Sequence, residues 1–210
     1  MRKTKEEAEA TRQAILQSAM DTFYEKGYSK TTFDEIAKRI NLTKGAVYWH
    51  FRNKPDLIAA IINDYFEKQK SYIAERQPVI QSFDDIINYF LHHSNFMLNN
   101  ENNYKVGFFL ICQMEWSEAI ITKVKPQVAK NKEYWFMKIQ ESLLWLQSKG
   151  EIDKNVDVNI LSHIIISSWG GIMDAVLSKR CNVSVEVMIR ESLNLIFNGL
   201  KMERMENASK

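Results

Sequence analysis

The residues best suited to a chemical role lie close together, in the run TKGAVYWHFRNK from Thr43 to Lys54. Lysine, tyrosine and histidine side chains supply hydrogen-bond donors, and a lysine can donate to guanine O6 and N7 in the major groove of DNA. Two large rings in this run would gain nothing from exposure to water. We therefore expect a DNA-reading surface made of Thr31, Thr32, Thr43, Lys44, Gly45, Ala46, Tyr48, Trp49, His50 and Lys54.

Two short helices joined by a tight turn would position these side chains. Their apolar residues repeat at helical spacing, first Phe33, Ile36, Ala37 and Ile40 and then, after a break at 41–43, Val47 and Phe51. This is a helix-turn-helix pattern. Thr43 is placed to cap the second helix, and Thr31 or Thr32 to cap the first and also to contact a phosphate. Gly45 and Ala46 would let the second helix approach the floor of the groove.

Such periodicity occurs in many small three-helix units, so spacing alone leaves DNA binding and a purely structural unit open. The segment TTFDEIAKRINLTKGAVYWHFRNKPDL resembles the DNA-binding domain of TetR-family transcriptional regulators, and GAVYWHF followed by a basic residue and Lys54 is similar to the AcrR-type branch. KTKEEAEATRQAILQSAMDTFYEKGY resembles the first helix of that branch. The resemblance covers about the first quarter of the chain. It implies a homodimeric regulator that binds double-stranded operator DNA.

The composition favours an all-α protein. The chain has 210 residues with only 3 Pro and 7 Gly, 45% hydrophobic residues, and no alternating run of strand length. We expect a three-helix DNA-binding domain over 1–54 and a helical ligand-binding and dimerisation domain over 55–210, about nine helices in all. The periodicity predicts helices over 5–26, the two short helices described above, a linking helix from Pro55 to just before Pro78, and then 83–99, 104–119, 125–149, 157–179 and 185–204.

Charge and cysteine usage set further bounds. Residues 1–56 carry eleven basic and eight acidic residues within a chain of net charge +2, which supports nucleic-acid binding only weakly. Two cysteines, Cys112 and Cys181, form no disulfide framework, and we expect them to be reduced and buried. No zinc-type spacing, signal peptide or apolar run of about 18 residues is found. These observations predict a cytoplasmic protein with no metal, cofactor or membrane partner.

Aromatic residues and methionines gather on the central helices. A stripe of this kind is either ordinary core or a hydrophobic pocket for a small lipophilic effector, because such side chains adapt to varied apolar molecules. A solvent-reachable cavity near Trp116, Trp135 and Trp169 would favour the pocket. The candidate ligand-binding residues are Phe66, Phe96, Phe109, Cys112, Gln113, Glu115, Trp116, Trp135, Ile139, Trp169 and Met173.

The last two predicted helices have the features of an association surface. Small residues would let another helix come close, and apolar residues repeat at a coiled-coil-like spacing. We expect a homodimer seam there, at Ile164, Ser168, Gly171, Ala175, Ile189, Leu193, Ile196 and Leu200. The alternative is that these helices pack only on the rest of their own chain.

Three functions from different classes follow from these patterns. The first is a repressor that a small lipophilic effector releases from a palindromic operator, and the AcrR-like resemblance suggests control of an efflux system. The second is a DNA-binding regulator with a filled core, which responds to a protein partner or to no ligand. The third is an enzyme, which the pattern disfavours because it contains no Gly-rich phosphate loop, nucleophile elbow or paired catalytic carboxylates.

Overall fold

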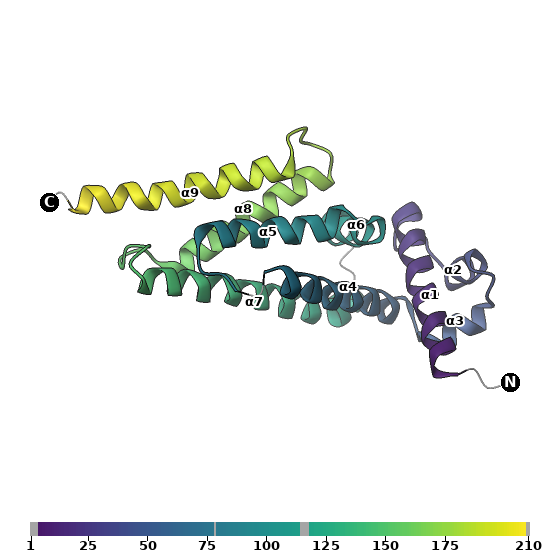
Figure 1. Ribbon diagram of the computed structural model, residues 1–210. Coiled ribbons are helices and arrows are strands. Elements are labelled where there is room, and N and C mark those ends of the chain that lie inside the picture. The colour runs from purple at the N-terminus through teal and green to yellow at the C-terminus, as the bar shows by residue number, and fades with distance from the viewer. Residues whose placement is uncertain (1–3, 78, 114–117, 209–210) are drawn as a thin grey trace. The chain divides into compact units, whose positions relative to one another are not determined.

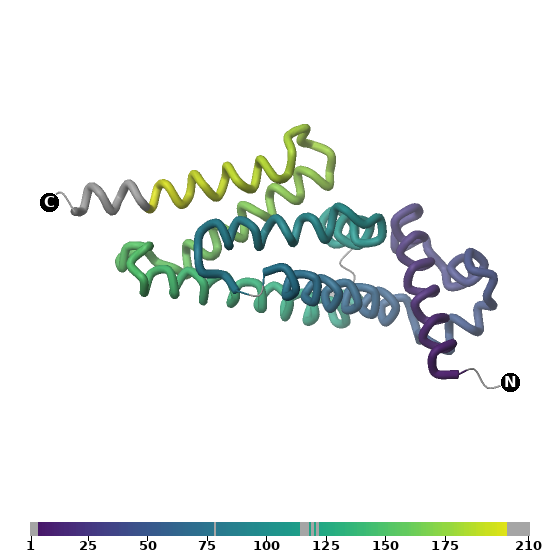
Figure 2. The backbone as a smooth tube through the Cα atoms, in the orientation of Figure 1, coloured from purple at the N-terminus to yellow at the C-terminus, as the bar shows by residue number. Residues whose placement is uncertain are grey.

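A computed structural model describes residues 4–77, 79–113 and 118–208, and describes no side chain at 119, 121 or beyond 200 (Figure 2). Within these ranges the chain forms α-helices and one π-helical turn, with no strand (Figure 1). The elements are α1 Lys5–Lys26, α2 Phe33–Arg39, α3 Lys44–His50, α4 Lys54–Arg76, α5 Phe83–Leu98, α6 Glu101–Phe108, the π-helical turn Phe109–Gln113, α7 Glu118–Ser148, α8 Val158–Leu177 and α9 Val185–Ala208. The all-α fold class predicted from the sequence is confirmed.

The chain divides into two compact units. Unit 1 contains residues 1–68 and 98–129, and unit 2 contains residues 69–97 and 130–210. Helices α4 and α7 therefore each contribute to both units. The division follows the packing of the helices and not their order in the chain: α6 belongs to unit 1 because it packs against α1. The functional boundary between residues 54 and 55 stays a prediction.

In unit 1 the first helix is closed at both ends by its own sequence. Thr4 accepts a hydrogen bond from the Glu7 amide at 3.2 Å, and the Glu7 carboxylate accepts from the Thr4 amide at 2.9 Å. This reciprocal pair satisfies amides that have no partner within the helix. The helix ends at Gly27, whose φ of 81° suits glycine because a Cβ would be strained there. The predicted bounds of this helix, 5–26, are confirmed.

Unit 2 is built around α5 and α8. Most of α5 is buried, including its polar residues His93 and Ser94, and α9 packs beside α8 (Figure 1). By length and composition alone, α8 is the one helix among the described residues that could cross a membrane. The buried core helix of a globular protein passes the same test, and Trp169 and Met173 of α8 are buried here. Part of the apolar surface of α8 is thus buried inside unit 2.

Two predicted helix boundaries are wrong. The expected break at Lys125-Pro126 is absent, because Pro126 lies inside α7. Proline is costly within a helix, yet the preceding turns are anchored by Ile120 and Val124, which are fully buried. The single helix predicted over 104–119 instead starts at Glu101, where the Asn100 side chain caps the amide of Asn103 at 3.0 Å, and it changes to the π-helical turn at Phe109.

Candidate nucleic-acid interface and small-molecule site

Helix α2 begins with a capping box. The Thr32 hydroxyl accepts from the Glu35 amide at 3.3 Å, and the Glu35 carboxylate accepts from the Thr32 amide at 3.0 Å. The same carboxylate pairs with Lys26 of α1 at 2.7 Å. Hydrogen bonds from Lys26 and then from Thr32 lower the pKa of Glu35 to about 2, so it stays ionised. The start of α2 is therefore fixed both locally and to α1.

The turn between α2 and α3 sets the direction of the second helix. Asn41 has a φ of 54°, a left-handed conformation that asparagine tolerates better than most residues. The Leu42 amide donates to the Ala37 carbonyl at 2.9 Å, which closes the turn. Thr43 then caps α3 by accepting from the Ala46 amide at 3.2 Å. Because Val47 is fully buried, the opposite face of α3 must point to solvent.

The outward face of α3 exposes large rings and a lysine. Trp49 is 74% and Tyr48 52% exposed. The Tyr48 ring lies edge-on to Phe33, with centroids 4.9 Å apart, and Lys44 Nζ lies 5.7 Å from the centroid of the Tyr48 ring. At Gly45 an added Cβ would meet only the Thr43 hydroxyl at 3.8 Å, so the backbone is open to an approaching surface. This arrangement can present donors and flat rings to a groove of DNA.

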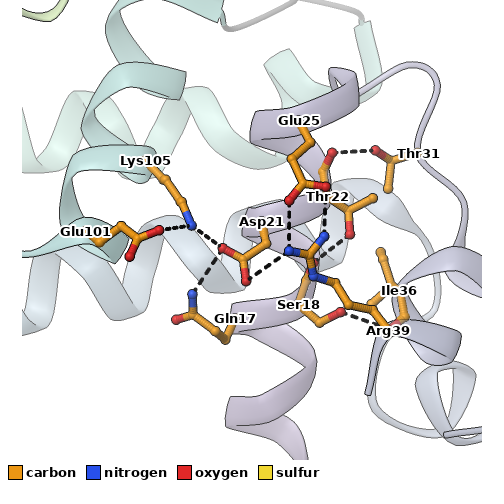
Figure 3. Close-up of polar contacts among 10 residues, drawn as sticks. All are labelled: Gln17, Ser18, Asp21, Thr22, Glu25, Thr31, Ile36, Arg39, Glu101 and Lys105. Atoms are coloured by element: carbon orange, nitrogen blue, oxygen red, sulfur yellow. Dashed lines mark hydrogen bonds and ion pairs between the residues drawn. The ribbon is translucent and has the colours of Figure 1, made fainter. Parts of the chain in front are cut away.

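Ion pairs and hydrogen bonds join α1 to α2 and to α6 (Figure 3). Arg39 of α2 makes two hydrogen bonds of 2.8 Å to Glu25 of α1, and these lower the pKa of Glu25. Lys105 of α6 pairs with Asp21 of α1 at 2.6 Å. The buried Ser18 hydroxyl donates to the Ile36 carbonyl at 2.9 Å. Several basic groups of unit 1 are thus used for internal bracing, whereas Lys44 lies on the outward face.

In unit 2 the aromatic residues form a packed cluster. Trp169 is 8% exposed, and its indole N–H donates to the Ser94 hydroxyl at 2.9 Å. Ser94 in turn donates to the Phe90 carbonyl at 2.9 Å. The ring of Trp135 lies 6.2 Å from that of Trp169, nearly perpendicular to it. Trp169 is therefore a satisfied core residue.

A hollow of about 170 Å³ lies next to this cluster, between the end of α4, α5 and α7, all within unit 2. Its wall includes the aromatic residues Tyr89, Tyr134 and Trp135, and His93. Lys70 and Lys138 also line it. This hollow can hold a small molecule that contacts Trp135 but not Trp169.

Comparison with known proteins identifies the family. Residues 15–61 match the sequence profile described as "Bacterial regulatory proteins, tetR family". The AcrR regulator of Shigella flexneri is 47% identical over 74 residues, 35% of this chain and 33% of that protein. The "Probable acrEF/envCD operon repressor" of Escherichia coli K12 is 27% identical over 213 residues, 96% of this chain and 90% of that protein. Residues 15–61 therefore belong to the TetR family of bacterial regulatory proteins.

Solved structures extend the likeness to the whole fold. NalD, from Pseudomonas aeruginosa, aligns with a TM-score of 0.77 at 22% identity, covering 93% of this chain and 98% of that chain. SmeT, from Stenotrophomonas maltophilia, aligns with a TM-score of 0.73 at 20% identity, covering 91% of each chain. The match to TtgR of Pseudomonas putida is closer, 43% identity, but spans about a third of the length of either protein, 32%. The likeness to the two solved structures, which are 22% and 20% identical, is thus one of fold.

Within the TetR-type domain, two predicted DNA contacts have internal partners. Thr31 is only 1% exposed, and its hydroxyl donates to the Gly27 carbonyl at 2.8 Å, so its predicted contact with a phosphate is not supported. The cap of α2 is Thr32. Lys54 donates to the Tyr28 and Ser29 carbonyls at 2.8 and 3.1 Å, which ties the start of α4 to the turn after α1. Of the other candidates, Thr32 lies at the start of α2, and the rest, half-buried Ala46 and His50 included, lie on α3 or at its cap; their contacts with DNA stay predictions.

The candidate ligand-binding residues do not form one group. Phe96, Trp135, Ile139, Trp169 and Met173 lie in unit 2, and of these only Trp135 lines the hollow. The others are buried. Phe66, Phe109, Cys112 and Gln113 lie in unit 1, and Glu115 and Trp116 fall outside the described residues. Cys112 is exposed and Cys181 half-buried, so the expectation of buried thiols is wrong, since the π-helical turn places Cys112 on its outer side.

The predicted dimer seam also needs correction. Ile189 and Leu193 are buried within the single chain, because this side of α9 packs against its own unit. The other predicted seam residues, Ile164, Ser168, Gly171, Ala175, Ile196 and Leu200, include exposed and half-buried positions on α8 and α9. The sequence analysis had not included the exposed apolar residues Ile160, Val187 and Leu195. They leave an apolar outer face on this helix pair.

Sequence analysis also missed most of the hollow. Its residues come from three helices, and no spacing in the sequence joins them. One signal was available: His93 follows Tyr89 and Phe90 at helical spacing, on a stripe that is otherwise apolar. A polar residue in a buried stripe requires a partner, which makes it a candidate for a site.

Proposed function

We propose that this TetR-family chain is a transcriptional repressor that binds operator DNA as a homodimer and is released by a small molecule bound in unit 2. The observation that carries the DNA-binding part is the outward face of α3, where Lys44, Tyr48 and Trp49 are presented by a helix that buried Val47 anchors. Exposed rings of this size are unusual on a free surface. DNA would cover them while α3 lies in the major groove.

The names of the relatives support repression. NalD is described as the secondary repressor of the MexAB-OprM multidrug efflux pump, and SmeT as the repressor of the SmeDEF multidrug efflux pump. SmeT is also described in complex with triclosan, so a protein with this fold takes a small molecule. We extend control of an efflux system to this chain as part of the proposal. A regulator of this kind acts on DNA in the cytoplasm.

The outer face of α8 and α9 supports the homodimer. Ile160 and Ile164 of α8 and Leu195 of α9 are exposed apolar residues on helices that are otherwise packed. A second copy would cover them through a two-fold interface. Such a dimer would present two recognition helices to a palindromic operator, with half-sites separated by about 34–36 Å or a multiple of it.

Release by an effector requires two states of different affinity for DNA. Helix α4 contributes to both units, since it begins beside the turn after α1 and its end lines the hollow of unit 2. A molecule in the hollow could therefore act on an element that also belongs to the DNA-binding unit. The alternative of a filled core is supported at Trp169, which is buried and hydrogen-bonded. It is also supported at Phe96, Ile139 and Met173, which are buried too.

A substitution on α3 tests the DNA-binding part. Lys44→Ala should weaken binding to the promoter beside the protein's own gene by about 1–3 kcal/mol and relax base preference, because a donor to base edges is lost. Binding is measured by fluorescence anisotropy on this promoter and on random DNA. The matched control is Lys38→Ala, which removes an exposed lysine of α2 that pairs with Asp34 at 2.6 Å. Equal losses on both DNAs would refute base reading by Lys44.

A further inference from the structure

His93 has no polar partner within the described part of the chain. Its residue is 3% exposed, and neither ring nitrogen makes a hydrogen bond to any described residue. A neutral imidazole carries one donor and one acceptor, and buried polar groups are normally satisfied. Trp169, its neighbour in the cluster, meets this rule through Ser94, whereas neither ring nitrogen of His93 does.

The surroundings of His93 are aromatic and hold it neutral. The rings of Tyr89 and Trp135 lie 4.6 and 5.0 Å from the imidazole, centroid to centroid, and that of Trp169 lies 6.0 Å away. Burial, with a smaller effect of His92, lowers the pKa of His93 to about 3. At neutral pH the ring therefore offers one N–H donor and one acceptor nitrogen, and no charge.

The hollow beside His93 is larger than a water site. Its volume of about 170 Å³ is roughly ten times the space that one water molecule needs. It is smaller than the pockets of about 300–1,000 Å³ that hold drug-sized ligands. Rings of Tyr89, Tyr134 and Trp135 form much of its wall. A small planar molecule fits this size and these surfaces.

The charged residues around the hollow favour a ligand of negative charge. Lys70 and Lys138 line it, and none of its described lining residues is Asp or Glu. Lys70 is exposed, and its Nζ lies 4.8 Å from the centroid of the Tyr134 ring, itself 44% exposed. Lys138, which also lines the hollow, is half-buried. Lys70 thus lies on the side of the hollow that solvent reaches, and His93 lies on its buried side. An anionic group is attracted to the first and a neutral polar group to the second.

We propose that this hollow is the effector site and takes a small aromatic acid. Its carboxylate would lie near Lys70 and Lys138, its ring against Tyr89 and Trp135, and a hydroxyl or carbonyl group would hydrogen-bond His93. The effector role of this site rests on the proposed function. The small lipophilic effector expected from the sequence is here narrowed to one chemical class, a small aromatic acid. Binding itself is independent of DNA.

Calorimetric titration of the full chain tests the site with three probes of similar shape. We expect 4-hydroxybenzoate to bind about tenfold or more tightly than neutral 4-hydroxybenzamide and cationic 4-hydroxybenzylamine, because only the acid can pair with the lysines. The variant Lys70→Gln/Lys138→Gln should remove most of this preference. Since Lys70 is exposed, its replacement leaves the core intact.

A substitution at His93 tests the buried end. His93→Phe keeps an aromatic ring but loses both polar atoms, and should weaken 4-hydroxybenzoate about tenfold or more, whereas benzoate, which lacks the hydroxyl, should lose little. The matched control is His92→Phe on the same helix, which should leave binding unchanged. If His93→Phe fails to fold, the lysine variant and the three probes still decide the matter.

The outcomes separate this site from the proposed function. Equal binding of acid and amide, no binding of any probe, or an unchanged affinity in His93→Phe overturns the site. Binding of the acid without release of promoter DNA keeps the site and overturns its role as effector. Release of DNA by lipophilic compounds, with equal efficiency in wild type and His93→Phe, keeps the proposed function and overturns the assignment of this hollow as the effector site.

Discussion

The helix-turn-helix and the aromatic cluster of unit 2 satisfy their polar groups in different ways. In the first, Thr32 and Thr43 cap amides only three residues away. In the second, Trp169 donates to Ser94, which lies 75 residues earlier in the sequence, and His93 finds no partner among the described residues. Where polar groups bond to neighbours in the sequence, the helices and their caps can be predicted from the sequence. Where polar groups bond to residues far along the chain, the sites are formed only when the chain folds and cannot be predicted from local sequence patterns.

The same residue type has opposite environments in the two regions. Trp49 on α3 is 74% exposed, whereas Trp169 on α8 is 8% exposed. Burial of a large aromatic side chain contributes to stability through the apolar area that it removes from water. An exposed ring contributes little to the fold and remains available for a partner. We therefore expect replacement of Trp169 to lower stability, and replacement of Trp49 to weaken DNA binding with little change in stability.

The largest expected effect comes from Trp169. Trp169→Ala should lower the free energy of unfolding by about 3–5 kcal/mol, because it leaves a cavity in the cluster and removes the donor to Ser94. Urea denaturation followed by circular dichroism measures the change. Trp49→Ala is the matched control and should change stability by less than about 0.5 kcal/mol while weakening DNA binding. Equal stability losses in the two variants would contradict the comparison.

An intermediate effect is expected from pH. Burial lowers the pKa of His93 to about 3, below the ordinary value near 6.5 that the unfolded chain restores. Between these values the unfolded state binds a proton that the folded state does not, so stability falls as pH falls below about 6.5. The slope is at most about 1.4 kcal/mol per pH unit, which amounts to roughly 2 kcal/mol at pH 5.

The contribution of His93 is isolated by comparison with His93→Phe. Carboxylates also titrate in acid, and they do so equally in both proteins. Urea denaturation at pH 7, 6 and 5 should therefore show a steeper loss in the wild type than in the variant. Parallel pH profiles would show that His93 titrates in the folded state as it does in the unfolded chain, against the burial described for it.

The smallest effect concerns a local cap. Thr32→Ala should lower the free energy of unfolding by about 1 kcal/mol, because the Glu35 amide loses its acceptor. Thr32→Ser keeps the hydroxyl and serves as the control. Both are measured by urea denaturation. A loss as large as that for Trp169→Ala would mean that the helix-turn-helix depends on long-range contacts at this position. It would contradict the difference drawn here between local contacts in the helix-turn-helix and long-range contacts in unit 2.

Much of the first domain could be predicted because its determinants lie within a few residues of each other. The bounds of α1, the two short helices and the caps follow from apolar spacing and from threonines ahead of free amides. The break at Pro126 could not be judged in the same way. Whether a helix continues through proline depends on what anchors its flanking turns, here Ile120 and Val124.

The candidate sites were predicted unevenly for the same reason. The outward face of α3 follows from the helical period once Val47 is assigned to the core. The periodicity of α9 placed Ile189 and Leu193 on one face, but could not tell whether that face meets another copy or its own chain. The ligand candidates were chosen by residue type, and only Trp135 among them lines the hollow.

The amino-acid sequence by itself determined the all-α class, the helix-turn-helix with its caps, and the resemblance to the TetR family. These depend on the 3.6-residue period and on hydrogen bonds that span three or four residues. The tertiary structure alone decided that Thr31 is buried and that Lys54 ties α4 to the turn after α1. It also decided that His93 lies without a described partner beside a hollow lined by lysines. Burial depends on residues far along the chain, and no local pattern encodes which of them meet.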